Sequence, residues 1–139
     1  MYRIELLSWD KAQPIAAPIR FAIFVAEQNV PPDIELDDMD EKSVHAIAYA
    51  PDGKAVGTGR LLPDGRIGRM AVLKEWRRQG VGTAILDALV QEARRRGHAE
   101  VSLSAQLQAA EFYRNHGFVA EGKVYLEAGI PHQKMRRRL

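Results

Sequence analysis

A short basic stretch with two glycines, RRQGVG at residues 77–82, has the residue types and spacing to bind an anion. Glycine has no Cβ, so the backbone at Gly80 and Gly82 can approach a ligand closely. We expect a helix to follow, and the N–H groups and dipole at the start of a helix attract negative charge. Arg77 and Arg78 add two cationic side chains. The segment therefore predicts a site for a phosphate or a pyrophosphate.

Two common nucleotide-binding motifs do not fit this stretch. A P-loop needs Lys and then Ser or Thr directly after its last glycine, whereas Thr83 and Ala84 follow Gly82. A dinucleotide-binding fingerprint needs a third glycine, and Ile85 occupies that position. What remains is the pattern R-x-x-G-x-G between a strand and a helix.

Composition excludes several other kinds of site. The 139 residues contain no cysteine, which rules out a disulfide framework, a cysteine nucleophile and a thiolate metal site. A dedicated nucleic-acid binder usually has a larger basic excess than 20 basic residues against 18 acidic ones. We see no signal-peptide core and no apolar run of membrane-spanning length. We therefore expect one cytoplasmic domain, residues 1–139, with no metal, no nucleic-acid partner and no membrane partner.

The elements that must position the anion site alternate between strands and helices. Hydrophobic periodicity and turn residues predict a strand at 2–7, a helix at 11–28 broken early by Pro14 and Pro18, an acidic loop at 29–42, a hairpin of 44–50 and 54–62, a strand at 66–73, a helix at 80–96, a strand at 99–105, a helix at 106–116, and a final strand pair of 118–122 and 124–137. The strand–helix–strand unit around residue 80 implies a parallel pair with a right-handed crossover. The hairpins make the sheet mixed, so the fold class is α/β with α+β character.

At this point the sequence resembles the GNAT superfamily of N-acetyltransferases. Arg77, Gly80 and Gly82 match its signature [QR]-x-x-G-x-[GA], and the segment AAEFYRNHGF at 109–118 matches its second motif, an aromatic-rich helix that ends in Gly-Phe. The order and separation of the two motifs also agree. The resemblance implies the GNAT acyl-CoA N-acyltransferase fold, in which helices flank a central, mixed, splayed β-sheet.

The resemblance also implies a cosubstrate and a reaction. We expect transfer of an acetyl group from acetyl-CoA to a primary amine, directly and within a ternary complex. Strands 69–73 and 101–105 should splay apart and leave room for the thioester, with the Val72 N–H as the oxyanion donor and Tyr113 as the acid that protonates the sulfur. The residues expected to contact the cosubstrate are Met70, Ala71, Val72, Arg77, Arg78, Gln79, Gly80, Val81, Gly82, Thr83, Gln106, Phe112 and Tyr113. Gln106 stands where the family often has asparagine.

The general base is left open by the sequence. Many relatives place a glutamate on the strand before the pyrophosphate loop, but residues 66–73 contain no acid. A histidine titrates near neutral pH and suits the role, so we favour His45 and His132. The other candidates are Glu27, Asp37, Asp40 and Glu127.

The acceptor side is suggested by residues 20–40, followed by GRLLP at 59–63. This part resembles the N-terminal region of acyl-homoserine-lactone synthases. Together with the ending YLEAGIPHQKM at 125–135 it also resembles the small bacterial acetyltransferases that include ElaA-like and YjcF-like proteins, which we take as the closest group. The residues expected to bind the acceptor are Arg20, Phe24, Glu27, Glu35, Asp37, Asp40, Arg60 and His132.

An acidic loop favours a cationic amine acceptor. We expect Arg20 and Arg60 to pair with its acids and hold its shape. Two alternative functions stay open, which are a synthase-like acyltransferase and a CoA-binding sensor without catalysis. Homodimers are common in the superfamily, although nothing in the sequence argues for one.

Overall fold

The computed structural model describes residues 2–139 and places a seven-stranded sheet within them, in the order β1-β2-β3-β4-β5-β7-β6. The strands are β1 (Arg3–Leu7), β2 (Val44–Tyr49), β3 (Ala55–Leu61), β4 (Arg66–Val72), β5 (Glu100–Gln106), β6 (Val119–Glu127) and β7 (Ile130–Arg138). The α-helices are α1 (Trp9–Arg20), α2 (Pro32–Glu35), α3 (Val81–Arg95) and α4 (Ala110–Arg114). A π-helical segment η1 (Phe21–Glu27) and the 3-10 turns η2 (Asp40–Lys42), η3 (Lys74–Trp76) and η4 (Leu107–Ala109) complete the chain.

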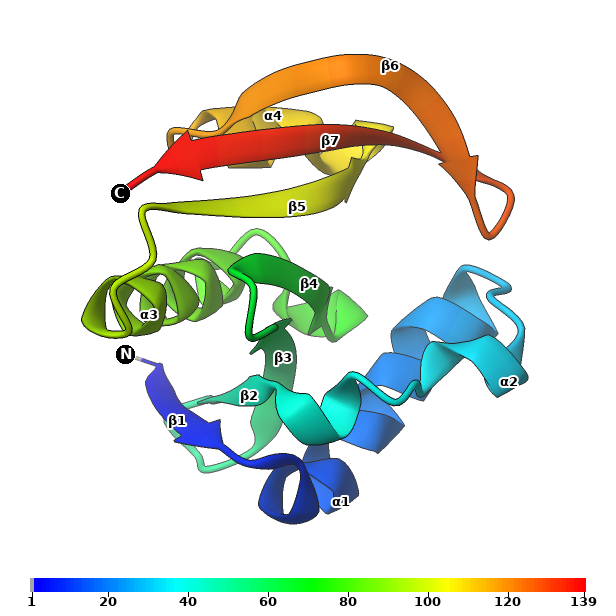
Figure 1. Ribbon diagram of the computed structural model, residues 1–139. Coiled ribbons are helices and arrows are strands. Elements are labelled where there is room, and N and C mark those ends of the chain that lie inside the picture. The colour runs from blue at the N-terminus through cyan, green and yellow to red at the C-terminus, as the bar shows by residue number, and fades with distance from the viewer. Residues whose placement is uncertain (1) are drawn as a thin grey trace.

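The sheet opens between β4 and β5. These two strands are parallel, as the strand–helix–strand unit predicted, but they pair only at Arg66↔Ser102 and Ile67↔Leu103. The register between β3 and β4 then shifts, and Arg69 has a positive φ of 48°. A bulge of this kind bends a strand away from its neighbour. Figure 1 shows β4 diverging from β5 beyond this point, which confirms the predicted splay.

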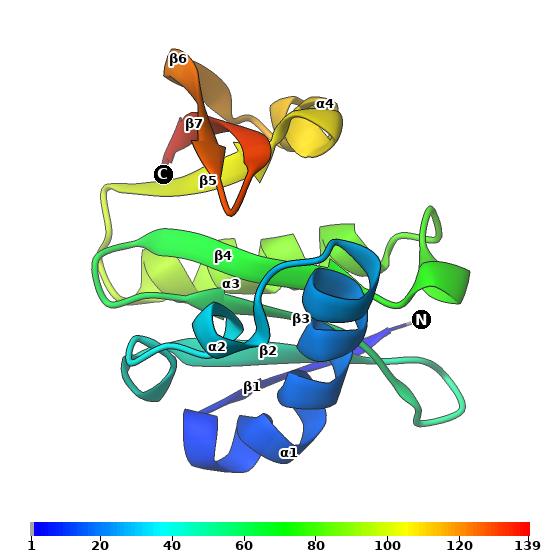
Figure 2. The same ribbon diagram turned by 90° about the vertical axis from the view of Figure 1, so that its right-hand side faces the viewer.

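Helices cover both faces of the first half of the sheet (Figure 2). Side chains alternate along β2, so Ala46 and Ala48 join the core beneath α3, while Ile47 packs with residues of α1. On β3, two glycines let α3 come close. A Cβ at Gly57 would lie 2.8 Å from Cδ1 of Ile85, a contact so short that the Ile85 side chain would have to shift.

The prediction that prolines break the first helix was wrong. Pro14 and Pro18 both lie inside α1, which buries Ala12 and Ala16 against the sheet. A proline inside a helix removes its own N–H bond and crowds the carbonyl four residues earlier, so the packing of this apolar face must outweigh that cost. The backbone then widens into η1, where the Gln28 N–H reaches back five residues to the carbonyl of Ile23 at 3.0 Å.

Two boundaries near the C-terminus also differ from the prediction. The expected helix at 106–116 is shorter, because β5 runs through Gln106 and the 3-10 turn η4 precedes α4. The final strand pair is confirmed, but its turn lies at Ala128 and Gly129, which have φ of 52° and 76°. Two successive positive φ values are typical of a tight hairpin turn. Residues near Lys123 instead form an irregularity within β6.

Candidate acyl-transfer site

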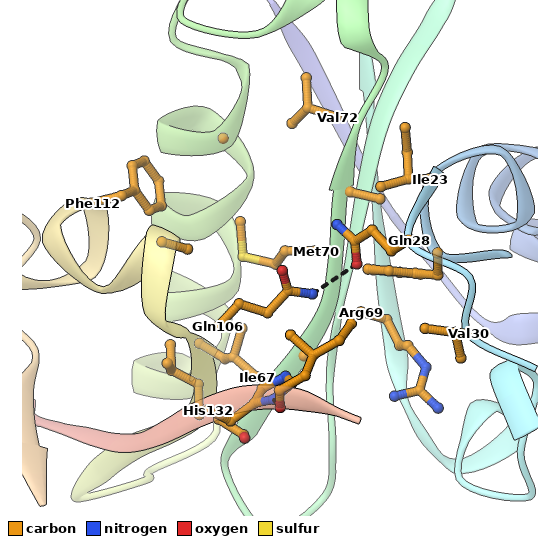
Figure 3. A pocket seen from close by; sticks show the side chains of 18 of the residues that line it. Ile23, Gln28, Val30, Ile67, Arg69, Met70, Val72, Gln106, Phe112 and His132 are labelled. Atoms are coloured by element: carbon orange, nitrogen blue, oxygen red, sulfur yellow. Dashed lines mark hydrogen bonds between the residues drawn. The ribbon is translucent and has the colours of Figure 1, made fainter. Parts of the chain in front are cut away.

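A cavity of about 1000 Å³ passes through the gap between β4 and β5. It extends from the start of α3 to the acidic loop and the tip of the β6–β7 hairpin. Figure 3 shows Met70 and Val72 on β4, Phe112 on α4, and His132 on β7 around it, with Ile23 and Gln28 on the opposite side. The two sequence motifs therefore meet at one site.

Most of the residues predicted to contact the cosubstrate line this cavity. Those that do are Met70, Ala71, Val72, Arg77, Arg78, Gly80, Gly82, Thr83, Gln106, Phe112 and Tyr113. Gln79 and Val81 do not, since the Gln79 side chain donates to the carbonyl of Glu75 at 3.0 Å and Val81 packs in the core. These two residues can contribute backbone amides only.

The loop at the start of α3 has backbone amides without partners in the helix, and such a loop suits a pyrophosphate. Gly80 has a φ of 87°, and a Cβ built there would meet nothing within 4 Å. Thus the conformation, and not a lack of space, requires glycine. The N–H of Ala84 bonds to the carbonyl of Gly80, and the amides of residues 81–83 precede it, where a helix has no internal partner for them. Arg78 lies beside this loop in the cavity wall.

The second glycine of the motif has a different role. A Cβ at Gly82 would lie 3.3 Å from Cζ of Phe112. Gly82 therefore lets the start of α3 pack closely against α4, so that the two motifs share one wall of the cavity.

The edge of β4 presents backbone groups to the cavity. The Leu73 N–H bonds to the carbonyl of Val56 at 2.9 Å, and Ala71 is the register partner of Thr58. Hydrogen-bonding direction alternates along an antiparallel strand, so the backbone groups of Met70 and Val72 point away from β3 and toward the gap. An amide-bearing chain could pair with this edge as an added strand.

Arg77 is occupied by contacts within the protein. Its Nε donates to the carbonyl of Val72 at 3.1 Å, and its Nη atoms donate to both carboxylate oxygens of Glu27 at 2.8 and 2.7 Å. The bond from Arg77 lowers the pKa of Glu27, which makes that carboxylate a poor base. Arg77 thus ties η1 to the strand that carries the Val72 N–H.

Tyr113 lines the cavity, and its hydroxyl carries its proton. Burial raises the pKa of its hydroxyl to about 12, so the group stays protonated at neutral pH. The edges of Phe112 and Phe118 hold the ring, with centroids at 5.1 and 5.9 Å.

Gln106 has a partner that sequence reasoning missed. Its Nε2 donates to Oε1 of Gln28 at 2.7 Å, across the cavity from the end of β5 to the end of η1 (Figure 3). A glutamine in a polar segment carries no sequence signal that separates it from an ordinary exposed residue.

The acidic loop is held by arginines, as predicted for Arg20 and Arg60. Arg20 is buried and donates to Glu35 at 3.1 Å and to Asp40 at 2.8 Å. Arg60 donates to Asp37 at 2.7 Å and to Asp40 at 2.8 Å. We call these five residues, together with Arg69, the ion-pair cluster.

Arg69 is the member of the cluster that the sequence analysis did not identify. Its Nε donates to the carbonyl of Glu35 at 3.1 Å and its Nη2 to Asp37 at 3.2 Å. The bulge in β4 directs this side chain, and nothing in the sequence marks the bulge.

Three arginines in the ion-pair cluster balance three carboxylates. The bond from Arg60 lowers the pKa of Asp37 to about 2. Burial works against ionisation of Asp40, but the bonds from Arg20 outweigh it and lower the pKa of that group, whereas burial raises the pKa of Glu35. Glu35 and Asp37, the acids of this loop that line the cavity, therefore do not present a free negative surface to it. Phe24, Glu27, Glu35, Asp37 and Arg60 line the cavity, while Arg20 and Asp40 do not.

The two histidines proposed as bases lie in different environments. His45 is buried on β2, its Nε2 lies 2.8 Å from the carbonyl of Asp40, and its ring packs on Trp9. Burial lowers its pKa, and the cavity lining does not include it. The structure thus gives His45 a position behind the ion-pair cluster, unsuited to a base that acts in the cavity. His132 does line the cavity.

None of the helices between residues 2 and 139 combines the length and the apolar character needed to cross a bilayer. Over the same range, no group of three or more histidine, aspartate or glutamate side chains is placed to hold a metal ion.

Comparisons with known proteins agree with this geometry. The family model for the acetyltransferase (GNAT) domain matches residues 21–139. The chain is 43% identical to the uncharacterised N-acetyltransferase YjcF of Bacillus subtilis, over 86% of this chain and 87% of that one. An acyl-CoA N-acyltransferase from Pseudomonas aeruginosa superposes with a TM-score of 0.86 at 32% identity, covering 99% of both chains. Escherichia coli ElaA gives 0.86 at 27% identity, covering 99% of this chain and 100% of that one.

Proposed function

Because the chain belongs to the GNAT acetyltransferase family and is therefore an acyltransferase, we propose that it transfers an acetyl group from acetyl-CoA directly to a primary amine. The observation that carries the proposal is the continuous cavity between β4 and β5. It joins the anion site at the start of α3 to His132 at the other end, so a donor and an acceptor can be bound together.

The chain offers a distinct group for each part of the donor. The amides of residues 81–83 and the side chain of Arg78 suit the pyrophosphate. The outward-facing backbone groups of Met70, and the remaining lone pair of the Val72 carbonyl, suit the amides of the pantetheine arm. Acetyl-CoA, when bound, supplies the thioester. The Val72 N–H then points into the gap, where negative charge develops on the acyl oxygen during transfer.

Two side chains accept and donate the protons of the reaction. His132 accepts one proton from the acceptor ammonium, which leaves a neutral amine with a lone pair, and later releases that proton to solvent. As the new C–N bond forms and the C–S bond breaks, Tyr113 gives its hydroxyl proton to the sulfur. The nitrogen loses a second proton, which restores the Tyr113 hydroxyl through solvent. The sum is an amide, a free thiol and one proton released.

The substitution Tyr113→Phe tests this proposal. It removes the acid and keeps the ring packing, so we expect kcat to fall by about 100-fold or more while the KM for acetyl-CoA is unchanged. Release of free thiol with a panel of primary amines measures both constants. Tyr49→Phe, on β2 and outside the cavity lining, is the matched control.

An unchanged kcat in Tyr113→Phe would remove Tyr113 from the mechanism. If the protein binds acetyl-CoA in calorimetry but none of the amines in the panel causes thiol release, the protein is instead a non-catalytic CoA-binding module.

A further inference from the structure

Two proton acceptors converge at the tip of the β6–β7 hairpin without contacting each other. Nδ1 of His132 lies 2.6 Å from the carbonyl oxygen of Ile130. A carbonyl only accepts, so Nδ1 carries the hydrogen and, in the neutral ring, Nε2 carries a lone pair. That lone pair faces Oε2 of Glu127 at 3.7 Å, too long for a hydrogen bond. A donor between the two atoms would satisfy both.

The His132 ring is oriented by its Nδ1 hydrogen bond to Ile130 and by a neighbouring tyrosine. Tyr125 stacks on it at a centroid distance of 6.2 Å, and the hydroxyl of Tyr125 is hydrogen-bonded to that of Ser104 on β5. His132 is also the register partner of Gln106 on β5. The ring therefore has a defined position in the cavity wall.

Glu127 differs from the other carboxylates in the cavity wall. Glu27, Glu35 and Asp37 each accept hydrogen bonds from arginine. Within residues 2–139, the only charged or titratable partner seen for Glu127 is His132, and its side chain is 54% exposed. It is therefore the one cavity carboxylate in that range whose charge no arginine offsets.

We propose that the ammonium group of the acceptor binds between Nε2 of His132 and Oε2 of Glu127, donating one N–H to each. The inference rests on the proposed function and names the acceptor class as a primary alkylammonium. Such a group has three N–H bonds and one carbon, so it fills both contacts and keeps one N–H. An alcohol lacks the charge, and a quaternary ammonium lacks the N–H. The cation site is thus the hairpin tip and not the acidic loop.

A binding experiment tests the inference without relying on turnover. n-Butylamine, protonated at neutral pH, is titrated into the isotope-labelled protein while the side-chain nitrogen resonances of His132 are followed. We expect a saturable shift with n-butylamine and none with n-butanol or trimethylbutylammonium. In Glu127→Gln the apparent Kd for n-butylamine should rise about tenfold or more, because a charge-assisted hydrogen bond is lost.

The matched control is Glu121→Gln. Glu121 lies on the same strand, is 44% exposed, and pairs with Lys134 and Arg136 outside the cavity lining. Its replacement should leave the Kd unchanged. The inference is overturned if n-butylamine leaves the His132 resonances unmoved, or if Glu127→Gln binds it as the wild type does.

Turnover separates this inference from the proposed function. If amine binding follows the expectation but no amine releases thiol from acetyl-CoA, the proposed function fails and the site stands. If thiol is released but Glu127→Gln leaves the KM for the amine unchanged, the function stands and the site fails.

Discussion

The two ends of the cavity are built from different parts of the chain. The end proposed for the donor is made of backbone, namely the amides at the start of α3 and the free edge of β4. The end proposed for the acceptor is made of side chains, namely the ion-pair cluster and the Glu127–His132 pair. Backbone geometry is fixed by the helix and strand that carry it, whereas each side-chain position depends on partners from distant segments.

Because of this difference, we expect the two ends of the cavity to tolerate different amino-acid substitutions. A donor site made of amides is insensitive to most side-chain changes and sensitive to changes at its glycines. At the acceptor end, the fully buried charges of Arg20, Glu35 and Asp40 are sensitive to the loss of any one of them, because the partners are left buried and unpaired. Three substitutions test that contrast, from the largest expected effect to the smallest.

Arg20→Met should have the largest effect on stability. It leaves Glu35 and Asp40 buried without their main cation, so we expect a loss of about 3–5 kcal/mol in the free energy of unfolding, measured with urea. Arg66→Met is the control, because Arg66 pairs with Asp64 at the surface with side chains 58% and 56% exposed. An exposed pair contributes about 0–1 kcal/mol. Equal losses in the two variants would contradict a cluster held by buried charge.

Gly80→Ala should have a smaller effect, seen mainly at the donor end. A left-handed conformation costs a non-glycine residue about 1–2 kcal/mol, and relief of that strain would move the amides of the loop. We expect the KM for acetyl-CoA to rise roughly 5-fold, which corresponds to about 1 kcal/mol. Thiol release at varied acetyl-CoA measures it.

Gly53→Ala is the control for Gly80→Ala, because it introduces the same kind of backbone strain outside the cavity. Gly53 has a φ of 90° and an equally open Cβ position, but it lies in the β2–β3 turn outside the cavity lining. Gly53→Ala should lower the free energy of unfolding about as much as Gly80→Ala does, but it should leave the KM for acetyl-CoA unchanged. A rise in KM for both variants would mean that general destabilisation, and not the loop, weakens binding.

Asp37→Asn should have the smallest effect, and it depends on pH. The pKa of Asp37 is lowered from 3.8 to about 2 by Arg60, so its stabilisation is complete above pH ~4 and is lost as the pH falls toward ~2. Because the side chain is 31% exposed, we expect only about 1 kcal/mol. The difference in unfolding free energy between wild type and variant should shrink over that range in urea titrations.

Glu92→Gln is the comparison for this pH dependence. Arg95 and Arg96 hold the pKa of Glu92 at about 2 as well, but Glu92 lies on α3 away from the cavity lining. Both variants should flatten the acid slope, and both should leave the KM for the amine unchanged, because the proposed amine site is the hairpin tip and Asp37 is paired with Arg60 and Arg69. A pH-independent difference for Asp37→Asn would contradict the pairing with Arg60.

The same contrast explains how much the sequence could predict. Gly80 must be glycine for its conformation and Gly82 for its close contact, so the donor loop leaves a pattern that can be read without a structure. The strand–helix–strand unit around residue 80 likewise predicted the parallel β4–β5 pair. The acidic loop predicted that arginines would pair with it, and Arg20 and Arg60 do so.

What the sequence could not predict depends on contacts between distant segments. Arg69 joins the ion-pair cluster through a bulge that has no sequence signal. Arg77 matches the motif, yet its side chain turns to Glu27, fifty positions away. Pro14 and Pro18 favour a break on local grounds, but burial of one face against the sheet outweighs that preference. His45 and His132 have the same side chain, and only the tertiary structure shows that His132 lines the cavity and His45 does not.

The hairpin that carries Glu127 and His132 has a consequence for how acceptor specificity could diverge. Strand β6 is exposed along its whole length and forms the edge of the sheet, where its strand partner is β7. We expect residues 124–130 to accept many substitutions without disturbing the core or the donor loop. Duplicated copies of such a gene could therefore acquire new acceptors by changing one short segment, and a library randomised there would be the direct route to redesigning the substrate.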